Sequence, residues 1–297
     1  MATVLLAALI ALLIGHAVPD LVRLRDFGWY QNWVCWCGDR PQARGLLPGQ
    51  WWLLLSILVP VLLLGLLQWS ARGQWWGLPS FVLATLVLTY CWGPRDLDAD
   101  VDAIGLAGDA SSRQQALQSL PDEPPEPALE VTPTVLVDQV FLAGLSRWFG
   151  VLFWFFVLGA AGALAYRLLR LALATESCRQ HLSAPQVESI RALARLLDWP
   201  VAQLMTVALA LAADFDAVVG AWRDFHGQGP VDSPAFDPGY LLAAARASVD
   251  LEPGSDADAD LQETAVAAAQ QALALIWRIL VVWLAAVSLL VLAGKIG

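Results

Sequence analysis

The sequence predicts an all-α protein: a polytopic helical membrane protein with four full spans, one embedded or re-entrant apolar helix segment, and amphipathic cytoplasmic helices. Of its 297 residues, 58% are hydrophobic, and the mean hydropathy is +0.59. Only 15% are charged, against about 25% in an average soluble domain. Fifteen tryptophans support the prediction, because tryptophan favours the membrane–water interface. The composition therefore excludes an ordinary water-soluble domain.

Residues 1–93 are predicted to form a three-helix membrane region. Residues 1–18 carry no formal charge, which predicts a membrane helix close to the ~20 residues that cross a bilayer. A cleaved signal peptide is the alternative, but it requires a basic segment, and the first arginine is Arg23. Two more spans are predicted over 51–69, where Pro60 introduces a kink, and over 75–92.

Residues 94–147 form an acidic loop and linker in this prediction. They contain ten acids and three arginines, a net charge of −7. Residues 101–120 are expected to form a short helix, and the proline- and acid-rich stretch 121–127 an extended linker. Aspartates alternate from Asp96 to Asp102, but the Gly and Glu of a calcium loop are missing at the required positions. We interpret this run as solvated acidic turns at a helix start.

The apolar stretch 148–173 either spans the membrane or lies re-entrant among the other helices. Gly159 and Gly162 would let another helix approach closely. Counting Arg and Lys favours the re-entrant alternative. With four crossings, fifteen basic residues lie on the cytoplasmic side and two outside. If the stretch crosses as well, the split falls to eight and nine, which loses the positive-inside bias.

Residues 174–260 are predicted to form a helical cytoplasmic region. A capped amphipathic helix is expected over 183–197, a break at Asp198–Pro200, and a more apolar helix as far as about Asp224. Residues 261–297 then form a long helix whose second half, 279–293, is the last span.

Three stretches resemble the AmpE family and its relatives, the CobD/CbiB cobalamin-biosynthesis proteins. The first is the apolar run from Phe149 through the Gly-Ala-Ala-Gly of 159–162 to Tyr166-Arg167. The second is Gly93-Pro-Arg-Asp-Leu97, continued by Asp100-Val-Asp-Ala103 and Gly108-Asp109. The third runs from the Leu-Asp-Trp-Pro of 197–200 through Ala213-Asp214-Phe215 to Ala221-Trp222. The resemblance covers roughly residues 93–225.

This resemblance implies a multi-pass protein of the bacterial inner membrane. AmpE is regarded as a signalling modulator of β-lactamase induction, a process tied to recycled cell-wall fragments. The CobD/CbiB group instead joins an aminopropanol unit to a corrinoid carboxylate. Its Gly-Arg-Asp motif should fall near 121–130, where this chain has the proline–acid linker, so AmpE is the better match. Ala160 departs from AmpE too, since it stands where that family has proline.

We therefore expect a non-enzymatic membrane regulator without catalytic residues, metal or cofactor. A corrinoid amide-forming enzyme and a structural membrane partner with no small ligand remain the alternatives. Partners are the lipid bilayer and an anionic cell-wall-derived ligand or a regulatory protein; the acidic balance argues against nucleic acid. The candidate ligand-binding residues are charged or aromatic and border apolar segments. They are Arg95, Asp96, Asp109, Arg147, Trp154, Tyr166, Arg167, Asp214 and Trp222.

Overall fold

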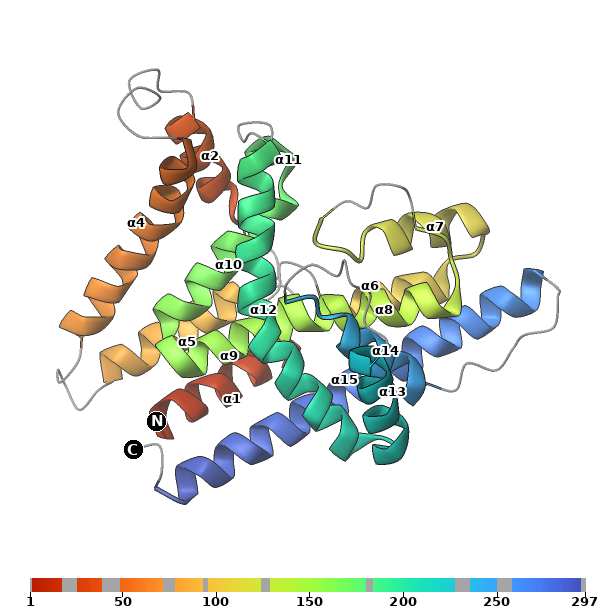
Figure 1. Ribbon diagram of the computed structural model, residues 1–297. Helices are drawn as coiled ribbons and strands as arrows, with labels where there is room; N and C mark the ends of the chain where they lie inside the picture. Colours follow the sequence, from red (N-terminus) through yellow and green to blue (C-terminus); the bar gives the residue numbers. More distant parts are fainter. Residues whose placement is uncertain are drawn as a thin grey trace. The chain divides into compact units, whose positions relative to one another are not determined.

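The structure is a computed structural model, and it is α-helical in the residues it describes (Figure 1). These residues are 2–17, 26–38, 49–71, 78–92, 96–123, 129–179, 184–227, 236–249 and 258–294. Three described helices are long and apolar enough to cross a membrane: Pro133–Leu158, Ala184–Ala212 and Glu263–Leu292. Shorter apolar helices are Val4–Ile14, Leu55–Ser70 and Leu78–Cys91. The predicted all-α class is confirmed, and the number of crossings stays a prediction.

The chain forms two compact units, each assembled from separated parts of the sequence. The first comprises Met1–Pro94, Gly150–Ala194 and Gly294–Gly297, and the second comprises Arg95–Phe149 and Arg195–Ala293. The long helices Pro133–Leu158 and Ala184–Ala212 each contribute residues to both units.

The first unit is a group of apolar helices packed around α10 (Ala160–Ala174). Helix α10 contacts α4, α5 and α9, and α1 packs against α5. Pro60 lies inside α4, as the sequence predicts. The helices of this unit besides α10 are α1 (Ala2–Ala17), α2 (Gly28–Gly38), α4 (Gly49–Ser70), α5 (Leu78–Cys91), α9 (Gly150–Leu158), α11 (Glu176–Arg179) and the first turns of α12.

The apolar stretch 148–173 is interrupted at Gly159, where the chain reverses. Gly159 has φ +74° and ψ −158°, a backbone conformation that is essentially restricted to glycine. On either side of it α9 and α10 run antiparallel. Two close approaches show this: a methyl group added to Gly150 would meet the Tyr166 ring, and one added to Gly162 would meet the Trp154 carbonyl oxygen. The segment is therefore a helical hairpin, and the expected close approach at Gly162 is confirmed.

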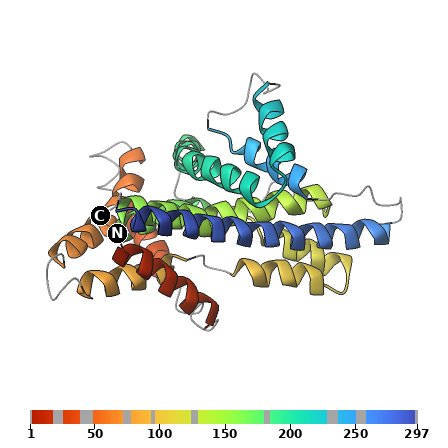
Figure 2. The ribbon, with the colours of Figure 1, turned by 90° about the horizontal axis from the view of Figure 1, so that it is seen from below.

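The second unit is built on two helices that run side by side in the same direction, α8 and α15. Gly144 lies against Ile276, and further along both helices the rings of Phe149 and Trp283 pack 5.1 Å apart. Figure 2 shows α15 as one uninterrupted helix, as the sequence predicts for 261–293. The helices of this unit are α6 (Leu97–Leu106), α7 (Ala110–Gln118), α8 (Pro133–Gly144), α12 (Ala184–Ala212, from Arg195 onward), α13 (Phe215–Gly227), α14 (Gly239–Ser248) and α15 (Asp258–Leu292).

Two expectations about helix boundaries are wrong. The single helix expected over 101–120 is divided at 107–109 into α6 and α7. The break expected at Asp198–Pro200 does not occur, since α12 continues through Pro200. Proline removes one backbone hydrogen bond from a helix interior, but Val201 and Ala202 directly after it are fully buried, and their packing holds the helix together. The expected cap at Ser183 and the end of the linker after residue 123 lie outside the described residues.

Candidate functional site

Arg147 occupies an irregular turn in the middle of an apolar helix. The helix Pro133–Leu158 is α-helical on either side of a π-helical turn at Leu145–Phe149, called η3. Such π turns occur frequently at functional sites. The Arg147 side chain is buried, with 2% of its surface exposed. A buried guanidinium is costly unless it is paired and hydrogen-bonded, so its surroundings determine whether the turn can persist.

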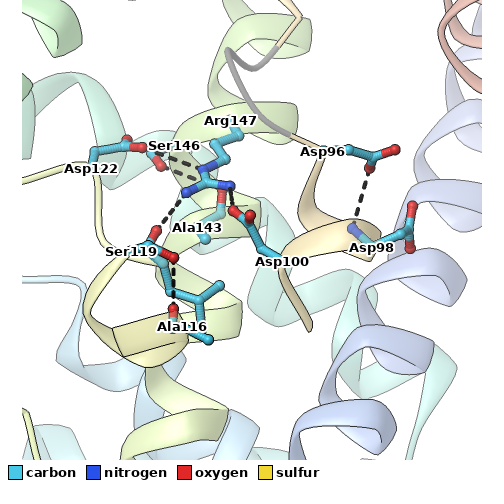
Figure 3. A network of polar contacts seen from close by, with 10 residues as sticks. Asp96, Asp98, Asp100, Ala116, Ser119, Asp122, Ala143, Ser146 and Arg147 are labelled. Carbon is cyan, nitrogen blue, oxygen red and sulfur yellow. Dashed lines mark hydrogen bonds and ion pairs between the residues drawn. The ribbon is translucent and has the colours of Figure 1, made fainter. Parts of the chain in front are cut away.

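Each nitrogen of the Arg147 guanidinium has an acceptor in the second unit (Figure 3). Its Nη1 lies 2.7 Å from Oδ2 of Asp100 and its Nε lies 3.4 Å from Oδ1 of Asp122. Its Nη2 donates a 2.6 Å hydrogen bond to the carbonyl oxygen of Leu120. We call Arg147, Asp100, Asp122 and the Leu120 carbonyl the Arg147 site. The Arg147 site therefore contains two carboxylates and one guanidinium, so it has more acidic than basic groups.

The acidic start of α6 positions Asp100. Asp96 is the N-cap residue, and its Oδ1 accepts a 3.2 Å hydrogen bond from the backbone N–H of Asp98. Because successive helical residues turn by about 100°, Asp100 points away from Asp98 and Asp102, which are four residues apart and lie on the same side of α6. Asp102 is exposed and Asp100 is 5% exposed. The interpretation of this run as a solvated turn is thus right for Asp102 and wrong for Asp100.

Asp98 links α6 to α15. Its Oδ1 accepts a 2.8 Å hydrogen bond from Nε1 of Trp277, and the Trp277 ring packs edge-on against Trp148 with centroids 4.9 Å apart. Burial raises the pKa of the Asp98 carboxyl above its ordinary value, although the Trp277 hydrogen bond opposes the shift. Trp148, which directly follows Arg147, is therefore packed against the same tryptophan that binds Asp98.

A second long-range ion pair ties α14 to α8. Arg246 binds Asp138 in a two-pronged arrangement, with Nε 2.7 Å from Oδ1 and Nη2 donating to Oδ2. The Asp138 hydrogen bonds raise the pKa of Arg246. This pair fixes α14 on the helix that leads into η3.

The other predicted residues of the second unit serve helix starts and an aromatic cluster. Asp109 is exposed at the start of α7 and accepts hydrogen bonds from the hydroxyls of Ser111 and Ser112, which lower its pKa. Asp214 is an exposed N-cap of α13, bonded to the N–H groups of residues 216 and 217. The ring of Trp222 packs in a tilted arrangement against His226, with centroids 4.4 Å apart.

The hairpin of the first unit carries three predicted residues. Trp154 lies on α9, and Tyr166 and Arg167 are buried on α10. Nε of Arg167 donates a 2.8 Å hydrogen bond to the carbonyl oxygen of Cys91. The last candidate, Arg95, lies outside the described residues. An anion-binding role for Arg95, Arg147 and Arg167 stays a prediction.

Sequence reasoning missed the partners of Arg147 rather than Arg147 itself. A charged residue in an apolar run signals that a counter-charge is required, and the sequence holds many acids that could supply it. The choice of Asp100 and Asp122 depends on how α6, α7 and α8 pack. Among the described residues no group of three potential metal ligands comes together. Comparison with protein-family models, curated proteins and solved structures yields no match to this chain.

Proposed function

We propose that this chain is a multi-pass regulatory protein of the bacterial inner membrane, AmpE-like and non-enzymatic, which modulates β-lactamase induction in response to cell-wall recycling. The resemblance over residues 93–225 supports the family, and the long apolar helices support the membrane location. In this proposal the Arg147 site is the part that responds to a ligand or partner.

The proposed topology has four crossings and a re-entrant hairpin. The crossings are α1, α4, α5 and the second half of α15. Counting Arg and Lys favours a re-entrant hairpin of α9 and α10 over a fifth crossing. The reversal at Gly159 would return the chain to the side from which α9 entered.

The observation that carries the functional proposal is the buried ion pair of Arg147 inside an apolar helix. A buried charge is costly unless it is paired, and a π turn often marks a functional site. The pair has an additional, longer contact to Asp122 at 3.4 Å. An anionic cell-wall fragment could replace Asp122 as the second counter-ion of Arg147 without leaving the cation unpaired. Release of Asp122 would free the segment after α7, and that change would be the signal.

Induction in a deletion strain tests this proposal. The host is a bacterium with an inducible β-lactamase from which the gene for its AmpE-family protein has been removed. The chain should restore induction, and Arg147→Met should not. Arg223→Met is the matched control, because Arg223 is an exposed arginine on α13.

The proposal is wrong if the deletion strain induces equally with and without the chain. It is also wrong if the chain restores growth to a strain that lacks the amide-forming step of corrinoid assembly, since that result would favour the enzymatic alternative.

A further inference from the structure

The second half of α12 is apolar on both of its faces. From Trp199 to Ala213 the chain contains no charged residue. One face is fully buried, with Val201, Met205 and Leu209 at 0% exposure. The other face is uncovered and is apolar except for the half-buried Gln203. Its side chains and exposed fractions are Leu204 46%, Val207 58% and Leu211 68%.

The next helix in the chain, α13, also exposes apolar side chains and separates them from charged residues. Phe215 and Trp222 are seven residues apart and therefore lie on one side of the helix; they are 57% and 38% exposed. Asp216 and Arg223, also seven apart, lie about 100° around the helix from them and are exposed. We call Leu204, Val207, Leu211, Phe215 and Trp222 the α12–α13 apolar face.

The buried hydroxyl of Thr206 is satisfied within the helix. The hydroxyl of Thr206 donates a 2.9 Å hydrogen bond to the carbonyl oxygen of Ala202, four residues earlier. Such a bond removes the need for a water partner. Asp214 ends the apolar run and caps α13 with hydrogen bonds of 2.9 Å and 3.1 Å. Asp214 is thus the first charged residue after Asp198, and it lies between the end of α12 and the start of α13.

We propose that the α12–α13 apolar face contacts the acyl chains of the lipid bilayer, with Asp214 and the charged side of α13 at the polar boundary. A water-exposed helix presents charges on its outer face, and none occurs here from Trp199 to Ala213. Trp222 lies where a membrane-interface tryptophan is expected, beside charged residues. The inference rests on the proposed membrane location and moves part of the predicted cytoplasmic region 174–260 into the membrane.

Spin labels on the full-length chain test this assignment. The four cysteines, Cys35, Cys37, Cys91 and Cys178, are replaced by serine, and a nitroxide is attached at Val207→Cys or Leu211→Cys. Both positions are exposed, so the label does not enter the core. The protein is placed in vesicles of phosphatidylethanolamine and phosphatidylglycerol. Accessibility to oxygen, which concentrates in lipid, is compared with accessibility to a water-soluble nickel chelate.

Two labelled sites serve as references. Asp224→Cys, on the exposed charged side of α13, should report water, and Leu289→Cys, 66% exposed near the end of α15, should report lipid. The inference predicts an oxygen-to-nickel ratio at positions 207 and 211 that is several-fold higher than at 224 and similar to that at 289.

Two results would overturn the inference. Nickel accessibility at 207 and 211 equal to that at 224 would mean that water covers the face. Low accessibility to both reagents would mean that protein covers it, as in a complex with a second copy. If position 289 is also open to nickel, the proposed membrane location itself fails, which separates the two proposals.

Discussion

Nη1 of Arg147 lies 2.7 Å from Oδ2 of Asp100, and both side chains are buried almost completely. The pair joins α6 to the π turn of an apolar helix, 47 residues away in the sequence. Because neither charge has ready access to water, the two groups depend on each other. The stability and the proposed function of the protein therefore rest on the same contact.

Removing the cation alone should strongly destabilise the second unit. Arg147→Met leaves Asp100 buried without its counter-charge, which typically costs about 3–5 kcal/mol. Thermal unfolding of the purified protein in detergent measures the effect, and the exposed control Arg223→Met should stay within about 0.5 kcal/mol of the original protein.

A charge-free variant should recover most of that stability. It combines Arg147→Met with Asp100→Leu and Asp122→Asn, which removes all three charges of the site. Apolar replacements of buried ion pairs are often neutral or stabilising. A variant that is as unstable as Arg147→Met would show that the three groups are not coupled in the way their distances indicate.

Gly159→Ala should destabilise the hairpin by about 1–3 kcal/mol, because φ at this position is strained for any residue with a Cβ. The added methyl group would also meet Nε2 of Gln68 at 2.6 Å. Gly65→Ala in α4 is the control, since nothing lies within 4 Å of its added methyl group. Alanine there should be neutral or stabilising. Equal effects at the two positions in thermal unfolding would contradict the hairpin geometry.

Gly150 and Tyr166 should show non-additive effects. A methyl group on Gly150 would lie 2.3 Å from Cζ of the buried Tyr166 ring, and overpacking of this kind costs about 1–3 kcal/mol. Tyr166→Ala removes the ring and leaves a cavity of its own. The double variant should be less unstable than the sum of the two single variants. Simple additivity would mean that α9 and α10 do not meet at these residues.

Asp98→Asn should change the pH dependence of stability. The raised pKa of Asp98 means that the folded protein holds the proton more tightly than the unfolded chain does. Stability from this group is therefore greatest below the ordinary value of 3.8 and is lost as the pH rises through the folded pKa. Asparagine stays neutral and can still accept the Trp277 hydrogen bond.

The variant should accordingly gain stability relative to the original protein at pH 7 and lose that advantage at low pH. Thermal unfolding across this range measures it, with the exposed Asp224→Asn as the control. An advantage for Asp98→Asn that is independent of pH would contradict the assignment of the shift to Asp98.

Composition and local pattern predict the helical class and the position of several helices, but not that of α8, which lies in the predicted loop and linker 94–147. An uncharged run of residues is a local signal, and α1, α4, α5 and the second half of α15 follow such runs. Arg147 and Arg167 are predicted site residues because each lies at the border of an apolar segment. Both proved to be buried and hydrogen-bonded.

Features that depend on long-range packing could not be predicted. The pairing of Asp100 with Arg147 spans 47 residues, and many acids competed for that role. The continuation of α12 through Pro200 depends on burial of Val201 and Ala202. The reversal at Gly159 has a local signal, a glycine in an apolar run, but the same signal also fits close helix packing.

The central claim is that the Arg147 site acts in regulation and does not merely stabilise the fold. β-Lactamase induction by the charge-free variant, at a membrane level matched to the original chain, tests this claim most directly. Induction by this variant is expected to stay at the level of the deletion strain although the variant is stable. Full induction by the stable, charge-free variant would contradict it and would assign Arg147 a structural role alone.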